Sequence, residues 1–261
     1  MTGHPAYDEL RRVTPVASVV LENNPSSMTL EGTNTWLLRT PAAESCVVVD
    51  PGYEDEPHLE KVAEAAGRIE LILLTHHHPD HAEGAPWLAA RTGAPVRALD
   101  PALCQNTPPL TDGATFEAAG LSFEVLHTPG HTEDSVCVRV SFNGKSAMLT
   151  GDSVLGRGTT VIADLGPYLT TLRRLIEEPR GTVALTGHGP ELPDVASIAR
   201  EYLAHRVERL NQVSAALAHL GGDATPRQIV ELVYADVDRS LWTPAEWSVK
   251  AQLDYLRGNE N

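Results

Sequence analysis

Cysteine is scarce in this sequence, and no long apolar run is present. Cys46, Cys104 and Cys137 are the only three cysteines among 261 residues, too few and too widely spaced for a disulfide framework or a Cys-x-x-Cys metal site. We therefore expect them to be small core residues of a protein in a reducing compartment. No 18 consecutive residues are apolar, and the first 22 residues lack the apolar stretch of a secretion signal. These absences predict a cytoplasmic protein that makes no membrane contact.

Basic residues are a minority as well. Lysine and arginine total 20 against 35 aspartate and glutamate residues, which gives a formal net charge of −15. This balance excludes a broadly basic nucleic-acid-binding protein, so contact with nucleic acid requires a local basic patch. One such patch can form if two predicted helices adjoin, and its arginines are Arg173, Arg174, Arg200, Arg206 and Arg209.

Short apolar segments alternate with amphipathic helical segments along the chain. Asn143-Gly144 between two apolar runs predicts a β-hairpin, and Gly221-Gly222 ends a long helical pattern before Thr225-Pro226 begins another. Strands on both sides of helices predict an α/β sandwich with helical outer layers. The predicted strands span residues 36–38, 46–49, 69–74, 121–126, 136–140, 147–149 and 182–185, and the predicted helices span residues 57–66, 164–178, 194–220 and 225–237.

Four metal-ligand side chains crowd the end of the predicted strand 69–74. Alternate positions of an extended segment face the same way, so His76 and His78 can bind one ion. The chain then turns into a helix start, where Asp80 and His81 can face a second ion. Imidazole and carboxylate suit Zn²⁺, although Fe or Mn also accepts such ligands. The alternative is a solvated histidine-rich loop.

Three later loops favour the metal site over that alternative. Each follows a predicted strand, and they contribute His131, Asp152 and His188. Each also contains glycine, which lets the backbone pass close to an ion. His77 and His127 are spaced so that they point elsewhere, and we leave them out of the ligand set.

Together these residues resemble the five-motif signature of the metallo-β-lactamase fold. The resemblance implies an αββα sandwich, a first ion held by His76, His78 and His131, a second held by Asp80, His81 and His188, and Asp152 bridging the two. The segments 32–36, 151–156 and 189–190 also resemble the subgroup with a C-terminal winged-helix domain, whose relatives include single-strand endoribonucleases. We therefore divide the chain into a catalytic domain, residues 1–195, and a linking helix with a truncated winged-helix-like domain, residues 196–261.

The C-terminal segment is acidic. Residues 221–261 hold seven acidic and four basic residues, a balance that argues against a winged helix that binds duplex DNA. Little chain remains after the last helix for a β-wing. Trp242 and Trp247 are interpreted as core or interface residues, so the unit either packs on the catalytic domain or forms a homodimer.

The ligand set predicts hydrolysis by a hydroxide held between two zinc ions. Asp80 would orient that hydroxide, and Asp152 would hold the ions together; no Gly-x-Ser-x-Gly or His-Glu-x-x-His motif competes for the role. The resemblance excludes nucleases with a β-CASP insertion, because only residues 153–187 separate the last two motifs. Antibiotic-degrading relatives commonly carry cysteine in place of Asp152, so β-lactam cleavage is at most a side activity.

Three functions stay open from the sequence alone. The first is cleavage of phosphodiester bonds in short single-stranded RNA. The second is hydrolysis of a small-molecule thioester, ester or lactone, as in glyoxalase II-like enzymes. The third is metal binding without catalysis.

Four further residues are candidates for substrate contact. Asn34 and Thr35 either cap a turn or line the pocket, as the resemblance implies. Arg157, with Thr160 nearby, can hold an anionic group through its guanidinium. By contrast, His58 lies on a predicted helix without partner spacing, and we expect it to be exposed or half-buried.

Overall fold

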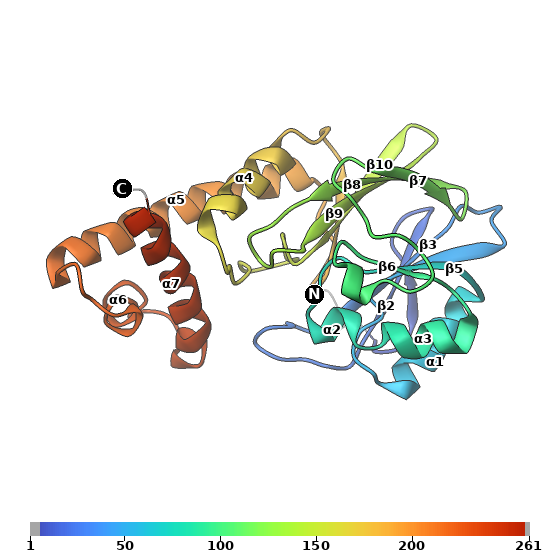
Figure 1. Ribbon diagram of the computed structural model, residues 1–261, viewed down its shortest axis with the longest axis horizontal. Coiled ribbons are helices and arrows are strands. Elements are labelled where there is room, and N and C mark those ends of the chain that lie inside the picture. Colours follow the sequence, from blue (N-terminus) through green and yellow to red (C-terminus); the bar gives the residue numbers. More distant parts are fainter. Residues whose placement is uncertain (1–5, 259–261) are drawn as a thin grey trace.

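The computed structural model describes residues 6–258, so residues 1–5 and 259–261 lie outside the described range. Two β-sheets stack face to face, helices cover their outer faces, and a helical unit follows at the C-terminal end (Figure 1). This arrangement confirms the expected αββα sandwich with a small helical C-terminal domain. None of the described helices is long and apolar enough to cross a bilayer.

The first sheet is built by the N-terminal half of the chain. Its strands lie in sequence order, antiparallel as far as β4, and β4–β5 and β5–β6 are parallel pairs. The carboxyl ends of β4 and β5 therefore meet at one edge. The strands are β1 (Leu10–Arg12), β2 (Ala17–Leu21), β3 (Asn34–Leu38), β4 (Ser45–Val49), β5 (Arg68–Leu73) and β6 (Val96–Arg97), and the helices are α1 (Glu56–Ala66), the short α2 (Pro79–Ala82) and α3 (Ala85–Thr92).

The second sheet is built by the following part of the chain and is also mostly antiparallel. Its order is β11-β10-β9-β8-β7, and only β10 and β11 are parallel. The predicted hairpin at Asn143-Gly144 is confirmed, because both residues adopt positive φ between β9 and β10. The strands are β7 (Thr115–Ala118), β8 (Leu121–His127), β9 (Val136–Phe142), β10 (Lys145–Gly151) and β11 (Val183–Thr186); a 3-10 turn spans Pro101–Leu103, and α4 (Leu165–Ile176) and α5 (Val195–Leu220) cover the outer face.

The central strands are buried on both faces, which explains their continuous apolar runs. In β4, Val47 and Val49 join the core between the sheets, whereas Cys46 and Val48 join the core under the helices of the first sheet. Cys137 lies in the corresponding core under α4 and α5. Full burial of one aliphatic side chain contributes about 1.5–3 kcal/mol, so alternation along each strand fixes the strand between two layers.

The C-terminal unit has its own small core. The second half of α5 packs against α6 (Pro226–Val233) and α7 (Trp242–Gly258), joined by a 3-10 turn, Arg239–Leu241. Trp242 is 8% exposed in this core, whereas Trp247 is 53% exposed. No strand follows β11 in residues 187–258, as expected for a domain without a wing. The predicted helix 225–237 was too long: Tyr234 leaves the helical conformation, and Val237 donates instead to the Tyr234 carbonyl.

Candidate metal centre

The ligand side chains come from four loops at one edge of the sandwich. After β5, His78 is extended because Pro79 follows it, and Pro79 begins α2. This turn separates His76 and His78 from Asp80 and His81. The loops after β8, β10 and β11 bring His131, Asp152 and His188 to the same edge. A Cβ atom on Gly187 would lie 2.4 Å from Asp152 Oδ1, so the close approach there requires glycine.

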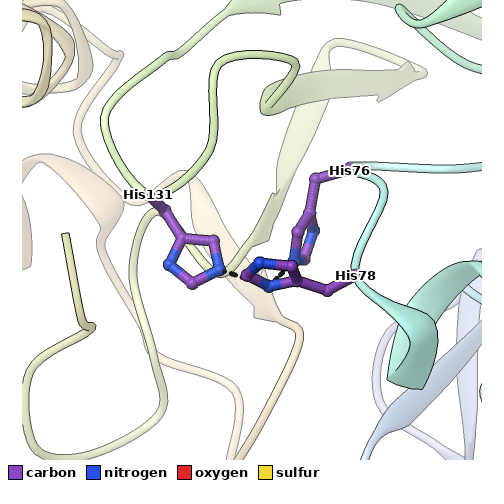
Figure 2. Close-up of side chains that lie close together, drawn as sticks. All are labelled: His76, His78 and His131. Carbon is purple, nitrogen blue, oxygen red and sulfur yellow. Dashed lines mark hydrogen bonds between the residues drawn. The ribbon is translucent and has the colours of Figure 1, made fainter. Parts of the chain in front are cut away.

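His76, His78 and His131 form the first group (Figure 2). His78 Nδ1 lies 3.2 Å from His76 Nε2 and 3.0 Å from His131 Nε2, so one nitrogen of each ring faces a common point. The structure thus brings together the three residues that the sequence analysis placed around the first ion.

Asp80, His81 and His188 form the second group. His188 Nε2 lies 3.3 Å from His81 Nε2 and 3.2 Å from Asp80 Oδ2. Asp152 stands between the groups, with Oδ2 3.3 Å from His188 Nε2 and 3.7 Å from His131 Nε2. Its carboxylate therefore faces both groups, as a bridging ligand must.

The spacing of these atoms fits metal ions. Zinc–nitrogen bonds of about 2.0–2.1 Å in a tetrahedron separate the ligand atoms by about 3.3 Å, close to the separations within each group. Asp152 Oδ1 is buried, accepts no hydrogen bond from residues 6–258, and lies 3.5 Å from His81 Nε2. A bound cation would satisfy that oxygen and the converging nitrogens. The chain therefore has His/Asp groups that can bind metal, and the donor set admits zinc, iron or manganese.

In four of the ligand histidines, the ring nitrogen that faces away from the metal centre makes a hydrogen bond. His131 Nδ1 lies 2.7 Å from the Val161 carbonyl, and His188 Nδ1 lies 3.1 Å from the Gly32 carbonyl. His81 Nδ1 lies 2.9 Å from Asp50 Oδ2, and His76 Nδ1 lies 3.0 Å from Thr75 Oγ1. A carbonyl or carboxylate only accepts, and Thr75 Oγ1 already donates its proton to Asp50 Oδ2, so all four contacts place the proton on Nδ1 and leave Nε2 free to bind metal.

Asp50 is a functional residue that the sequence analysis missed. The sequence Asp50-Pro51-Gly52 is typical of a turn, and Asp50 was not among the candidate residues, yet it is 2% exposed. Its carboxylate accepts hydrogen bonds from Thr75 N at 2.8 Å, Thr75 Oγ1 at 2.7 Å and His81 Nδ1 at 2.9 Å. The available signal was an acidic residue directly after a buried strand, parallel to the strand before the histidine cluster.

Burial and neighbouring charges set the protonation of the site. Burial lowers the pKa of His76 and of His131, and burial together with the nearby His131 lowers the pKa of His78 to about 4. Burial also acts on His188, but the carboxylates of Asp152 and Asp80 outweigh it and raise that pKa to about 10. The first group is therefore neutral at pH 7, and a cation in the second group would displace a proton.

The four substrate candidates have partners inside the protein. Asn34 Nδ2 donates to the Thr186 and Gly189 carbonyls at 3.0 and 2.8 Å. The fully buried Thr35 donates to the Asp50 carbonyl at 2.9 Å. Thr160 Oγ1 lies 3.1 Å from His131 Nδ1, and Arg157 pairs with Glu31. These contacts orient the ligand loops, and contact of the four residues with substrate stays a prediction.

The other histidines near the site, His77, His127 and His58, are not metal-ligand candidates in the structure. His77 Nδ1 lies 2.6 Å from Asp134 Oδ1, and His127 Nε2 lies 2.7 Å from the Glu133 carbonyl; neither belongs to the two groups. The expectation for His58 was wrong, because it is fully buried on the inner face of α1. Its two ring nitrogens contact Asp8 Oδ1 at 2.7 Å and Thr35 Oγ1 at 3.1 Å, which offsets the cost of burial.

The expected basic patch is also wrong in part. The two helices do adjoin, but Arg206 is only 4% exposed and donates to the Thr160 carbonyl. Arg174 lies on the surface and pairs with Asp112 at 2.7 Å. The patch therefore lacks the positive charge of one arginine, and a carboxylate partly neutralises a second.

Comparisons with known proteins agree with this geometry. Residues 28–188 match the family model described as "Metallo-beta-lactamase superfamily", and residues 225–258 match "Beta-lactamase associated winged helix domain". The chain is 34% identical over 222 residues to "Lactamase-like protein adaB" of Aspergillus niger, covering 82% of this chain and 67% of that protein. It is 31% identical over 230 residues to "Atrochrysone carboxyl ACP thioesterase AgnL7" of Paecilomyces divaricatus, covering 84% and 70%. A beta-lactamase domain protein from Burkholderia ambifaria has the same fold, with a TM-score of 0.79 at 21% identity over 97% of this chain and 90% of that one.

Proposed function

Because the chain belongs to the metallo-β-lactamase superfamily of hydrolases, we propose that it cleaves acyl thioesters or related esters at a centre of two zinc ions. The observation that carries the proposal is the meeting of His76, His78 and His131 with Asp80, His81 and His188 around Asp152. Curated relatives named as acyl carrier protein thioesterases, 31% and 30% identical to this chain, support the acyl substrate.

The ions and the residues of this centre would have different roles in the reaction. When bound, the ions would supply Lewis acidity toward a carbonyl oxygen and would activate water near neutral pH. Asp80 is more exposed than Asp152, 15% against 9%, so its carboxylate is the more accessible of the two to water. Its carboxylate would accept a proton from the attacking water. The water oxygen then bonds to the acyl carbon, the C–S bond breaks, and the thiol leaves with a proton.

The net charge of the chain favours hydrolysis of acyl thioesters or esters over cleavage of RNA. An extended RNA strand requires a basic path along the protein, whereas this chain carries a formal charge of −15. The five-arginine patch is reduced because Arg206 is buried. A single acyl group needs no such path. Cleavage of short single-stranded RNA stays a prediction, as does metal binding without catalysis.

The test compares wild-type protein with Asp80→Ala on acyl thioesters, lactones and short fluorescent single-stranded RNA. We expect about two zinc ions per chain and thioester turnover that falls by about 10²- to 10⁴-fold in the variant. Asp134→Ala is the matched control, because Asp134 pairs with the non-ligand His77. The circular dichroism spectra of Asp80→Ala and wild type should match, which shows that the variant is folded. RNA cleavage alone, sensitive to Asp80→Ala, would overturn the acyl proposal, and no turnover by a fully metal-loaded protein would favour a binding role.

A homodimer through the C-terminal unit is proposed as the oligomeric state. The exposed Trp247 on α7 offers an apolar surface there. Light scattering of wild-type protein and Trp247→Ser would test it, and a monomeric wild-type protein would overturn it.

A further inference from the structure

Helix α5 reaches from the C-terminal unit to the loop that follows Asp152. Tyr202 and Arg206 are four residues apart and so share one face of the helix. The Tyr202 hydroxyl donates to the Gly158 carbonyl at 2.7 Å and accepts from Leu155 N at 3.2 Å. Arg206 Nη2 donates to the Thr160 carbonyl. One face of α5 thus holds this loop at three positions.

The same loop contacts the first metal-ligand group. Thr160 offers its carbonyl to Arg206 and its hydroxyl to His131, with Oγ1 3.1 Å from His131 Nδ1. The next residue, Val161, accepts from the same His131 nitrogen at 2.7 Å. The loop also begins at Asp152, which faces both groups. Displacement of this loop would therefore move the ring of His131.

Arg206 is an unexpected residue at this position. Its guanidinium lies 5.4 Å from the ring centre of Tyr168, and its Nε is buried without a hydrogen-bond partner among residues 6–258. No Asp or Glu in that range forms an ion pair with it. Burial of an unpaired guanidinium opposes folding, so an apolar side chain of similar volume would suit the packing better. The contacts of Arg206 instead connect it to the loop. It donates directly to the Thr160 carbonyl. It also lies against Tyr168, whose hydroxyl donates to the Ser153 carbonyl at 2.8 Å.

We infer that Arg206 and Tyr202 are positioning residues that hold loop 152–161 so that His131 presents Nε2 to the first ion. Because Val213 and Ala216 of the same helix belong to the core of the C-terminal unit, that unit anchors the helix that carries them. The inference rests on the metal centre of the proposed function, but it does not depend on the substrate.

The experiment titrates metal-free protein with Co²⁺, whose absorption bands report the ligands of each ion. Arg206→Met keeps the volume and removes the donor. We expect it to weaken binding at the His76, His78 and His131 group by about 10- to 100-fold and to change the bands of that ion. The other ion should keep its affinity. Arg206→Lys should restore part of the loss, because it returns a charged donor.

Tyr202→Phe and Arg209→Met complete the test. Tyr202→Phe removes one hydroxyl and should weaken the same ion in the same direction, which keeps the inference testable if Arg206→Met does not fold. Arg209 lies on the same helix but donates to the Val233 carbonyl inside the C-terminal unit, so Arg209→Met should bind both ions like wild type. Wild-type affinity and bands in folded Arg206→Met, or an equal loss in Arg209→Met, would overturn the inference. If wild type itself fails to bind two ions, the proposed function fails instead.

Discussion

Asp50→Asn tests whether the hydrogen-bond partner of a ligand decides metal affinity. Asp50 has φ of 51°, a conformation that asparagine tolerates well, so the substitution leaves the backbone unstrained. The asparagine oxygen can still accept from Thr75 N. Its amide NH₂, however, would face His81 Nδ1, which donates to Asp50 in the wild type. His81 must then carry its proton on Nε2, the atom that faces Asp80, Asp152 and His188.

The expected loss can be worked out in two ways. A hydrogen bond to a charged acceptor contributes about 1.5–3 kcal/mol. Removing the hydrogen-bond partner of a metal-binding histidine typically weakens binding by about 10- to 100-fold, which corresponds to about 1.4–2.8 kcal/mol. The two estimates agree, so one of two ions should bind about 10- to 100-fold more weakly. Calorimetric titration of metal-free protein with Zn²⁺ measures this directly.

The matched control is Asp134→Asn. Asp134 and His77 form a pair of the same type, with 2.6 Å between Oδ1 and Nδ1, but His77 belongs to neither metal-ligand group. The control should therefore bind both ions like wild type. Two ions of wild-type affinity in Asp50→Asn would refute the reasoning.

Three further predictions concern stability. Burial raises the pKa of Glu22 from 4.5 to about 8, so the folded protein keeps a proton that the unfolded chain releases, and stability should fall as pH rises from about 4.5 to about 8. Thermal unfolding of Glu22→Gln, measured across this pH range, should lack this part of the fall in stability. An unchanged pH dependence would contradict the assignment. Arg139→Met leaves Glu178, whose side chain is 3% exposed, without its partner. It should lower the free energy of unfolding, measured in urea, by about 3 kcal/mol. A decrease below about 1 kcal/mol would count against a buried pair. Trp242→Ala should cost about 3–5 kcal/mol and Trp247→Ala much less, because they are 8% and 53% exposed; equal losses would be inconsistent with the C-terminal core.

Local patterns in the sequence were sufficient for most elements and for the histidine cluster, whereas the assignment of His131, Asp152 and His188 to the two ions came from the family resemblance. The strand that precedes the histidine cluster is a continuous apolar run, and Pro79 marks the turn that splits the cluster in two. Four of the seven ligand candidates lie within six consecutive residues, from His76 to His81. Such signals are local, so no knowledge of the tertiary fold was needed to predict that these side chains converge.

Contacts between distant segments could not be predicted in the same way. Arg157 and Glu31 are 126 residues apart, and the contact of Arg206 with Thr160 spans 46. The residue type of Arg206 argues against burial, because arginine is rarely fully buried without a charged partner, although Tyr202 and Leu203 precede it by one helical turn. His58 was misjudged for a related reason: its partner Asp8 comes from the N-terminal segment, 50 residues away.

Ligands drawn from both sheets give a bound ion a second effect, on the unfolded chain. His81 and His188 are 107 residues apart in sequence, so an ion that holds both closes a loop of that length. By the chain-entropy model for covalent cross-links, closing a loop of about 100 residues reduces unfolded-state entropy by an amount equivalent to about 4.7 kcal/mol. This entropy cost disfavours binding of one ion by both ligands in the unfolded chain, so the ion would bind the folded protein in preference and stabilise it. Metal supply would then govern how long the folded protein persists, as well as whether it is active.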